Sequence, residues 1–552
     1  MTVFSGKANP SADKLRGGYY TPEPIGQFLG DWVTQVGSHF LEPSCGDGAI
    51  LQFLTGENKE VTAIELLELE AHKAQKRTGT KVDVADFFKW FTRDKFAQFD
   101  GVAGNPPYIR FGNWSETSRV SALMIMEDVG LKPNRLTNAW VPFVVGSILA
   151  TRSGGRVGLV LPAELLQVGY ASQLRAFLVE NTSEITLVSF EQLVFPGILQ
   201  EVVLLLATVG DGPSVFRSVE LSDAYDLANL KLPRDGIRAR LHEDEKWTKY
   251  YLQPRDVDLV RGMRTDRRLK RLDTYATVNV GVVTGRNSYF CLTEEQARNL
   301  RLYEETVPLV ARSALLEGLS YTQEDMARHA ADGARTRLLV VEPGRNLGDY
   351  PALAEYVEQG AMNGVDQGYK CRIRKDWWAV PSAHLADGFM LRQVSSSLRL
   401  SSNEVSATST DTVHRVFTKP GVQMSNLATV ALNSISLAFS EVLGRSYGGG
   451  ILEMEPSECA ELPVPDPSCV PKHIIVAADK MVRSGCIEEA VDLVDREVLI
   501  ERCGFSAADV RQMRGVWLTM RNRRLARGLR KVKSTVPEIE RIVQGRIPAR
   551  AA

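Results

Sequence analysis

The sequence has no long apolar run, no Cys-x-x-Cys pair and almost no net charge, and each absence excludes a class of protein. Without a run of about 18 apolar residues we expect no membrane span, and the N-terminus lacks the apolar core of a signal peptide. Seven scattered cysteines, an odd number, argue against a disulfide framework or a metal site and for a reducing compartment. With a net charge of −1, any site for a polyanion must come from a local patch.

What the sequence does contain is the composition of an ordinary globular protein, 44% hydrophobic and 24% charged. The length of 552 residues leaves room for about three or four domains. Between residues 40 and 108, apolar strand-like runs, glycine or proline turns and helical stretches alternate. This alternation predicts an α/β domain with a parallel sheet whose ligands bind at the carboxyl ends of the strands.

One of these strand-like runs, residues 99–104, ends in the corner Asn105-Pro106-Pro107-Tyr108. The two prolines fix φ and remove two N–H donors, and Asn105 is pushed toward extended geometry. The Asn105 amide and the Pro106 carbonyl are therefore rigid acceptors that suit a flat amino group, and Tyr108 offers a ring for it to stack on. The alternative is a plain proline turn after a strand.

A second turn, Glu42-Pro43-Ser44-Cys45-Gly46-Asp47-Gly48, follows the strand-like Phe40-Leu41. Glycines such as Gly46 let a ligand approach the backbone closely. The turn is neither G-x-G-x-x-G nor a P-loop, so it predicts neither a dinucleotide nor a triphosphate. Glu42 and Asp47 would repel phosphate and favour a cationic ligand such as a sulfonium amino acid.

Three further positions complete a candidate site for a nucleoside-like ligand. Thr21 is placed to cap a helix at residues 24–33, where a hydroxyl and a helix N-terminus could hold a carboxylate. Glu65 ends the second strand, about 20 residues after the glycine turn, the place from which an acid binds ribose hydroxyls. Asp86 and Phe87 follow the third strand and could bind an adenine amino group and ring. A capped surface helix and a solvated helix start are the alternatives for Thr21 and Glu65.

Four motifs in one order resemble the gamma class of S-adenosylmethionine-dependent DNA adenine-N6 methyltransferases, the N-P-P-Y enzymes of the TaqI type: 18–22, 42–48, 86–87 and 105–108. The resemblance implies a Rossmann-like S-adenosylmethionine-dependent methyltransferase domain, then a mixed α+β target-recognition domain and a helical basic C-terminus. We place these at residues 1–240, 241–470 and 471–552. The implied cofactor is S-adenosyl-L-methionine, and the residues that would hold it are Thr21, Glu42, Ser44, Gly46, Asp47, Glu65, Asp86 and Phe87.

The resemblance also implies how a base would be treated. The target adenine would be flipped out of the duplex, and its amino group would donate to Asn105 and to the Pro106 carbonyl. Phe195 matches the family's aromatic residue before a strand, and with Tyr108 it would clamp the base at about 1–3 kcal/mol per stacking contact. Core packing is the alternative for Phe195. The connection 109–136 is expected to be a mobile loop near the DNA.

The remaining 300 or so residues contain basic and glycine-rich stretches that resemble the family's recognition region or suit contact with DNA. Any one of them could equally be a solvated face. They are residues 264–271, 280–290, 372–378, 432–434, 444–450 and 455–465. The basic C-terminal residues, for which phosphate contact is expected, are Arg511, Arg514, Arg521, Arg523, Arg524, Arg527, Arg530, Lys531 and Lys533.

These observations predict a cytoplasmic, prokaryotic enzyme that methylates adenine N6 in double-stranded DNA, as part of restriction-modification or phage defence. A separate restriction endonuclease or other defence subunits are candidate partners. The alternatives are N4-cytosine methylation, methylation of RNA or of a protein glutamine, and a DNA-binding module without activity. The intact Asn105 and the cofactor motifs argue against the last.

Overall fold

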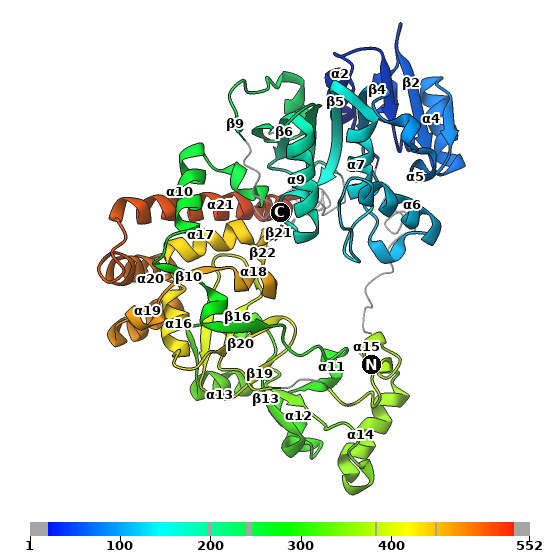
Figure 1. Ribbon diagram of the computed structural model, residues 1–552. Helices are drawn as coiled ribbons and strands as arrows, with labels where there is room; N and C mark the ends of the chain where they lie inside the picture. Colours follow the sequence, from blue (N-terminus) through cyan, green and yellow to red (C-terminus); the bar gives the residue numbers. More distant parts are fainter. Residues whose placement is uncertain are drawn as a thin grey trace, which may run out of the picture. The chain divides into compact units, whose positions relative to one another are not determined.

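The computed structural model describes residues 20–195, 201–212, 214–238, 246–380, 384–447 and 450–534. The chain divides into two compact units (Figure 1). The first contains the chain up to Tyr251, and the second contains Leu252–Ser446 and Gly450–Leu525.

The first unit is built on a sheet of nine strands in the order β3-β2-β1-β4-β5-β7-β6-β8-β9. The strands are β1 His39–Glu42, β2 Glu60–Glu65, β3 Val82–Val84, β4 Phe99–Gly104, β5 Thr151–Pro162, β6 Thr182–Phe190, β7 Val202–Val209, β8 Val215–Leu221 and β9 Ile237–Arg238. Neighbours pair in parallel except where β7 runs antiparallel to β5 and β6, and β9 antiparallel to β8. The predicted α/β, Rossmann-like architecture is confirmed.

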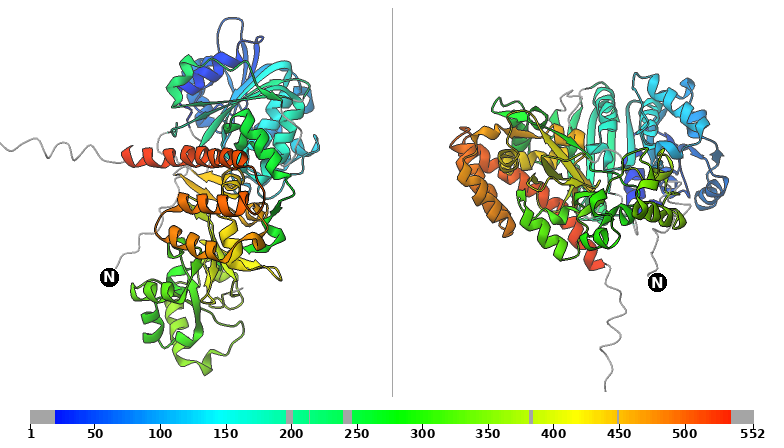
Figure 2. Two further views of the ribbon diagram at one scale, coloured as in Figure 1. Left: turned by 90° about the vertical axis from the view of Figure 1, so that its left-hand side faces the viewer. Right: turned by 90° about the horizontal axis from the view of Figure 1, so that it is seen from below.

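Helices cover both faces of this sheet (Figures 1 and 2). They include α2 Glu23–Val33, α3 Leu51–Leu54, α4 Glu68–Thr78, α5 Phe87–Trp90, α6 Glu116–Glu127, α7 Trp140–Ala150, α8 Glu164–Gln167 and α9 Ser172–Asn181. Successive strand residues point to opposite faces. Leu41 and Val102 therefore lie in the core cluster with α7, while Phe40 and Ala103 lie in the cluster with α2.

The topology brings distant segments to one edge of the sheet. Strands β1, β2 and β4 run in parallel and end there at Glu42, Glu65 and Gly104. Because β7 runs antiparallel to β5, with Val202 opposite Pro162, it begins at the edge where β5 ends. β6 also runs antiparallel to β7, with Ser189 opposite Val203, so Phe195, which follows β6, lies at the same edge as the corner after β4.

The prediction of a loop at residues 109–136 is wrong in part, because this stretch contains the helix α6. Ser115 caps it by accepting a hydrogen bond from the Ser118 N–H at 3.2 Å. Ala122, Ile125 and Met126, at helical spacing, are buried against the core. The many polar residues around these three concealed the periodicity in the sequence.

The second unit combines small sheets with helices, the mixed α+β architecture expected for it. A five-stranded sheet has the order β11 Ala276–Asn279, β20 Val413–Thr418, β16 Gly388–Leu391, β18 Leu400–Asn403 and β14 Ser320–Tyr321. A four-stranded sheet has the order β12 Cys291–Leu292, β15 Arg337–Leu339, β13 Thr306–Val310 and β19 Thr408–Ser409. Helices α16 Met424–Val430, α17 Ser434–Leu443, α19 Lys472–Arg483 and α20 Ile487–Val494 follow.

The C-terminal helices up to Leu525 belong to this same unit. Asp495 accepts hydrogen bonds from the Ser434 N–H at 2.9 Å and from its hydroxyl at 2.5 Å. In α21 (Ala507–Ser534), Arg524 forms a buried ion pair with Glu441 of α17. These contacts join the helical region after residue 471 to the elements before it.

Several of the basic residues predicted to contact phosphate are neutralised within the unit. Arg514 pairs with Glu488 and Asp492, and Arg521 pairs with Glu488. The side chains of Arg527, Arg530, Lys531 and Lys533 lie outside the described residues. Phosphate contact by this helix stays a prediction.

None of the helices described by the structure is, on its own, long and apolar enough to cross a membrane. One bent pair, α16 with α17, passes that test only when both helices are counted together.

Candidate active site

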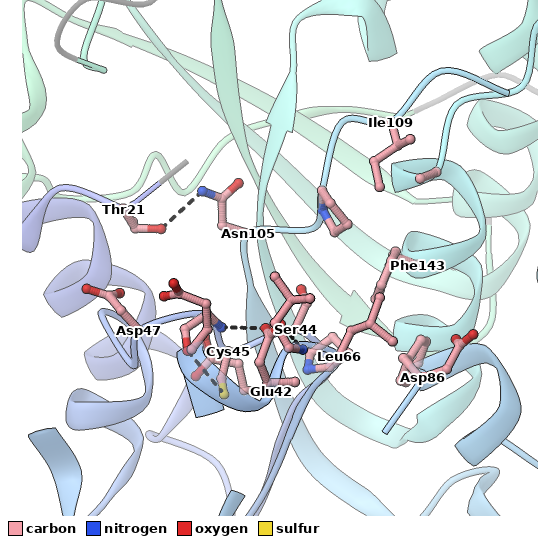
Figure 3. A pocket seen from close by; sticks show the side chains of 18 of the residues that line it. Thr21, Glu42, Ser44, Cys45, Asp47, Leu66, Asp86, Asn105, Ile109 and Phe143 are labelled. Carbon is pink, nitrogen blue, oxygen red and sulfur yellow. Dashed lines mark hydrogen bonds between the residues drawn. The ribbon is translucent and has the colours of Figure 1, made fainter. Parts of the chain in front are cut away.

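A cavity of about 890 Å³ opens at the carboxyl edge of the first unit's sheet (Figure 3). Of the residues predicted for catalysis or cofactor binding, all but Pro106 and Tyr108 line it: Thr21, Glu42, Ser44, Gly46, Asp47, Glu65, Asp86, Phe87, Asn105 and Phe195. The sequence-distant motifs thus meet in one place, as the strand order requires.

Asn105 extends from the end of β4 into the cavity. Its Nδ2 donates to the Thr21 hydroxyl at 3.1 Å, which holds the amide plane (Figure 3). The Tyr108 hydroxyl lies 3.2 Å from Asn105 Oδ1 and 3.1 Å from the Val160 carbonyl oxygen, and its single proton is shared between these two acceptors. Tyr108 packs against two core clusters of the first unit, the one with α7 and the one with α2. It orients Asn105 in this structure, and its stacking role stays a prediction.

The turn after β1 is held by Glu65. The Gly46 N–H donates to Glu65 Oε2 and the Leu67 N–H donates to Glu65 Oε1, each at 2.9 Å. Gly46 and Gly48 have φ values of +54° and +83°, which residues with a Cβ rarely adopt. A Cβ at Gly48 would also lie 3.0 Å from the Ala74 Cα. Both glycines are therefore needed for the backbone conformation of the turn, and Gly48 also for its close approach to α4.

Glu42 and Ser44 are the clearest sign of a ligand in this cavity. Glu42 is 1% exposed, and neither its Oε2 nor the Ser44 Oγ has a hydrogen-bond partner among the described residues. Burial, with the negative charges of Glu65 and Asp47, raises the pKa of Glu42 well above its usual range. Asp47 itself pairs with Arg77 at 2.7 Å. A buried carboxyl without a counter-ion and a buried hydroxyl without an acceptor fit a ligand that brings a cation and polar groups.

Asp86 and Phe87 form the other end of the cavity. Asp86 Oδ1 accepts from the Phe88 N–H at 3.0 Å and caps α5, while its Oδ2 accepts from the Ser118 hydroxyl at 2.6 Å. The Phe87 ring stacks on Phe143 with centroids 5.1 Å apart. Asp86 thus ties α6 to the cavity, and its remaining lone pairs are available to a ligand.

Phe195 is 4% exposed, and it lines the cavity while packing in the cluster that contains Val160 and Val202. Core packing and contact with a ligand are compatible at this position. Residues 196–200, which follow it, lie outside the described residues, as do Gly18 and Tyr19 of the first motif.

Sequence reasoning missed a group of residues that also line the cavity: Ile109, Trp114, Ser118, Ala139 and Phe143. Trp114 and Ser118 belong to the stretch expected to be a loop. The signal that could have found them is the Ser115 cap followed by buried residues at helical spacing. In the part of the chain that the structure describes, no cluster of three or more His, Cys, Asp or Glu side chains could hold a metal ion.

Comparison with known proteins identifies the family. The model "Eco57I restriction-modification methylase" matches residues 49–195, and "Type II methyltransferase M.Eco57I, C-terminal domain" matches residues 244–499. Type II methyltransferase M.AccI of Acinetobacter calcoaceticus is 20% identical over 80% of this chain and 83% of its own length. Type II methyltransferase M.XamI of Xanthomonas campestris pv. amaranthicola is 23% identical over 81% of this chain and 85% of its own length. The solved type IIG restriction endonuclease BpuSI aligns with 94% of this chain and 67% of its own at 13% identity, with a TM-score of 0.40.

The two family matches follow one another in the order of the two compact units, and the first contains the corner after β4 and Phe195. The chain is therefore a gamma-class type II DNA methyltransferase of the restriction-modification type, and its cofactor is S-adenosyl-L-methionine.

Proposed function

We propose that this chain transfers the methyl group of S-adenosyl-L-methionine to N6 of adenine at a specific site in duplex DNA, within a restriction-modification or other phage-defence system. The observation that supports the proposal most strongly is the position of the Asn105 side chain. Its amide donates a hydrogen bond to Thr21 and lines the same cavity as Glu42 and Ser44. The Glu42 Oε2 and Ser44 Oγ atoms are buried and have no hydrogen-bond partner among the described residues. A methyl acceptor and a cationic methyl donor would meet there.

S-adenosyl-L-methionine supplies the methyl group when it is bound. We assign its ammonium group to Glu42, since this buried carboxyl has no other counter-ion among the described residues. Glu65, at the end of β2, would accept from the ribose hydroxyls, and Asp86 with Phe87 would hold the adenine. Thr21, Ser44, Gly46 and Asp47 complete the cofactor site.

The protein's contribution to the reaction is positioning and electrostatics. Asn105 Oδ1 and the Pro106 carbonyl would accept the two hydrogens of the target amino group. That geometry aims the nitrogen lone pair into the cavity and stabilises the positive charge that develops on nitrogen. An adenine inside a duplex cannot reach this corner, so the base must be flipped.

Replacing Phe195 with alanine should weaken capture of the flipped base. We expect a loss of about 1–3 kcal/mol, the value of one base–aromatic stacking contact. The measurement is the fluorescence rise of 2-aminopurine placed at the target position. Phe195→Tyr should keep the rise because it keeps the ring, whereas Phe195→Leu should lose it while keeping the core filled. An alanine variant with the wild-type rise would leave Phe195 a core residue only.

Cofactor binding should depend on pH through Glu42. Its pKa is raised in the free protein, and only the carboxylate attracts an ammonium group. Affinity for S-adenosyl-L-methionine should therefore rise as pH increases through that pKa, and binding should release a proton. The charged groups that face Glu42 are Glu65 and Asp47, the latter paired with Arg77.

Calorimetric titration at several pH values measures this effect. Glu42→Gln should bind the cofactor roughly 10- to 100-fold more weakly, the loss of one charge-assisted hydrogen bond, and its affinity should vary less with pH than that of the wild type. Glu57→Gln, at an exposed position outside the cavity, is the matched control. The same pH dependence in the Glu42→Gln variant would contradict the assignment.

The proposal as a whole is tested by single-molecule sequencing of plasmid DNA from a methylation-free host that expresses this chain. N6-methyladenine in one short motif is the expected result. N4-methylcytosine in such a motif would change the base but keep the chemistry. DNA without any modified base would overturn the proposal and direct the search to RNA, to a protein glutamine or to a missing partner subunit.

A further inference from the structure

In the second unit, two segments far apart in the sequence form one surface. They are residues 283–288, which lead into α11 (Asn287–Phe290), and residues 369–375, which begin with α15 (Tyr369–Arg372) (Figure 1). Arg374 joins them, because its Nη2 donates to the carbonyls of Val283 at 2.8 Å and Thr284 at 2.9 Å. The backbone of Gly285 comes so close that a Cβ there would lie 2.8 Å from Lys370 Cβ. We call these residues the α11–α15 patch.

The patch is supported by a rigid core. Trp377 packs on Tyr289, with ring centroids 5.5 Å apart, and on Phe290 at 6.4 Å. Burial lowers the pKa of Arg374 from its usual value, as expected for a guanidinium used to hold structure. The side chains above this core are thus presented on a fixed frame.

Four cations of the patch are exposed: Arg286, Lys370, Arg372 and Lys375. None of their side chains forms an ion pair or a hydrogen bond with any described residue. Lys370 makes only a cation–π contact, with its ammonium group 5.7 Å from the centre of the Tyr369 ring. The two segments contain no carboxylate. Of the flanking acids, Asp376 already accepts from the Gly344 N–H at 2.7 Å.

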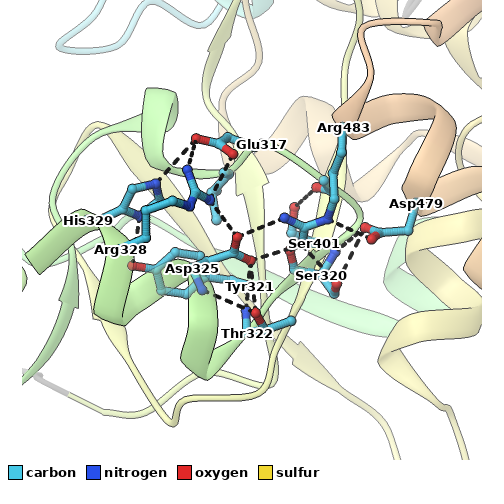
Figure 4. Close-up of polar contacts among 12 residues, drawn as sticks. Glu317, Ser320, Tyr321, Thr322, Asp325, Arg328, His329, Ser401, Asp479 and Arg483 are labelled. Atoms are coloured by element: carbon cyan, nitrogen blue, oxygen red, sulfur yellow. Dashed lines mark hydrogen bonds and ion pairs between the residues drawn. The ribbon is translucent and has the colours of Figure 1, made fainter. Parts of the chain in front are cut away.

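Most arginines elsewhere in this unit are paired with carboxylates or bound to backbone carbonyls of the unit itself. In Figure 4, Arg328 pairs with Glu317 and Asp325, and Arg483 pairs with Asp325 and Asp479. The basic stretch 264–271 is interrupted by Asp266, which pairs with Arg268. Of the other exposed cations without a partner among the described residues, Arg267 and Lys270 lie in that same stretch beside Asp266, and others stand apart in the sequence, for example Arg301, Arg312, Lys419 and Lys472. Four such cations gathered without a carboxylate are therefore a local field for a polyanion.

Two apolar side chains stand among these charges. Tyr369 is 65% exposed and Ile373 is 59% exposed. Duplex DNA has a negative charge about every 1.7 Å along its axis, and its sugars and base edges lie between the phosphates. A surface with fixed cations around an exposed ring and an aliphatic side chain matches that alternation of charge and apolar area.

We propose that the α11–α15 patch binds the backbone of duplex DNA, with Arg286, Lys370, Arg372 and Lys375 on phosphates and with Tyr369 and Ile373 against sugars or base edges. This assignment rests on the proposed function, because it takes duplex DNA as the substrate. It places DNA contact on a surface of the second unit alone, apart from the cavity that holds Asn105.

The test uses the full chain and a labelled random-sequence DNA duplex, with affinity measured by fluorescence anisotropy at salt concentrations from about 50 to 200 mM. The patch variant carries Arg286→Ala, Lys370→Ala, Arg372→Ala and Lys375→Ala. Each phosphate contact contributes about 0.9 to the slope of log affinity against log salt. The slope of the patch variant should therefore be smaller by about 3 to 4 than that of the wild type.

A control variant removes the same charge from four exposed positions elsewhere in the unit: Arg301→Ala, Arg312→Ala, Lys419→Ala and Lys472→Ala. Its slope should equal that of the wild type. A charge-keeping variant, with each Lys exchanged for Arg and each Arg for Lys at the patch, should restore binding, which excludes misfolding as the cause of the loss.

The outcomes separate the two proposals. A wild-type slope in the patch variant, from a protein that does methylate DNA, would overturn the patch and leave the function standing. Equal losses in the patch and control variants would also overturn it, because net charge alone would then explain binding. A wild-type chain that neither binds nor methylates DNA would overturn both.

Discussion

Replacing Asn105 with alanine is expected to abolish methyl transfer while leaving cofactor affinity close to that of the wild type. The side chain provides a positioned acceptor at the reacting amino group, and losing one such preorganised group costs a rate factor of roughly 10² to 10³. Because Asn105 follows β4, while Glu42, Ser44 and Glu65 lie at the ends of β1 and β2, these three cofactor residues stay in place. The measurements are transfer of a labelled methyl group to DNA and calorimetric binding of the cofactor.

Two controls sharpen this prediction. Asn105→Asp keeps the shape and one acceptor oxygen but cannot donate to Thr21, a hydrogen bond of 3.1 Å in the wild type. It should be more active than Asn105→Ala and less active than the wild type. Thr21→Val tests the same bond from the other side and should lower the rate without removing the acceptor. An Asn105→Ala variant with normal turnover would remove Asn105 from the mechanism.

The first unit was predictable from the sequence where its signals are local. The glycine turn after β1, the acid that ends β2 and the two prolines after β4 all lie at strand ends, and an alternating α/β pattern places such ends at one edge. What stayed hidden needs the tertiary structure. Phe195 lies at the edge because β6, which it follows, runs in the same direction as β5 and ends there. The isolation of Glu42 depends on its burial and on Arg77 pairing with Asp47 instead.

Charge in the second unit could not be interpreted from the sequence for a related reason. A run of arginines has the same appearance whether its partners are solvent, phosphate or distant carboxylates. Arg264 pairs with Glu461, 197 residues away, and Arg524 with Glu441, 83 residues away. The sequence separates the α11–α15 patch into two unremarkable stretches, and only the fold unites them.

The buried pair in α21 gives the largest stability effect that we expect. Arg524 is 2% exposed and Glu441 is 5% exposed. Arg524 donates from Nε to Glu441 Oε2 at 2.9 Å and from Nη2 to Oε1 at 2.5 Å, and its Nη1 reaches the carbonyls of Ser395 at 2.8 Å and Gly450 at 2.5 Å. One guanidinium therefore satisfies a buried carboxylate, the buried carbonyl of Gly450 and the partly buried carbonyl of Ser395.

Arg524→Ala should lower the free energy of unfolding of the second unit by about 3–5 kcal/mol, because it leaves the Glu441 carboxylate buried without a partner. Urea unfolding measures this loss. Arg511→Ala is the matched control on the same helix, since Arg511 is exposed and has no ion pair with a described residue, and it should change stability by less than about 0.5 kcal/mol. The double variant Arg524→Met with Glu441→Leu should lose less than Arg524→Ala alone, because removing both charges removes the desolvation cost that either one bears by itself. If Arg524→Ala were as mild as Arg511→Ala, the pair would not hold α21 to α17.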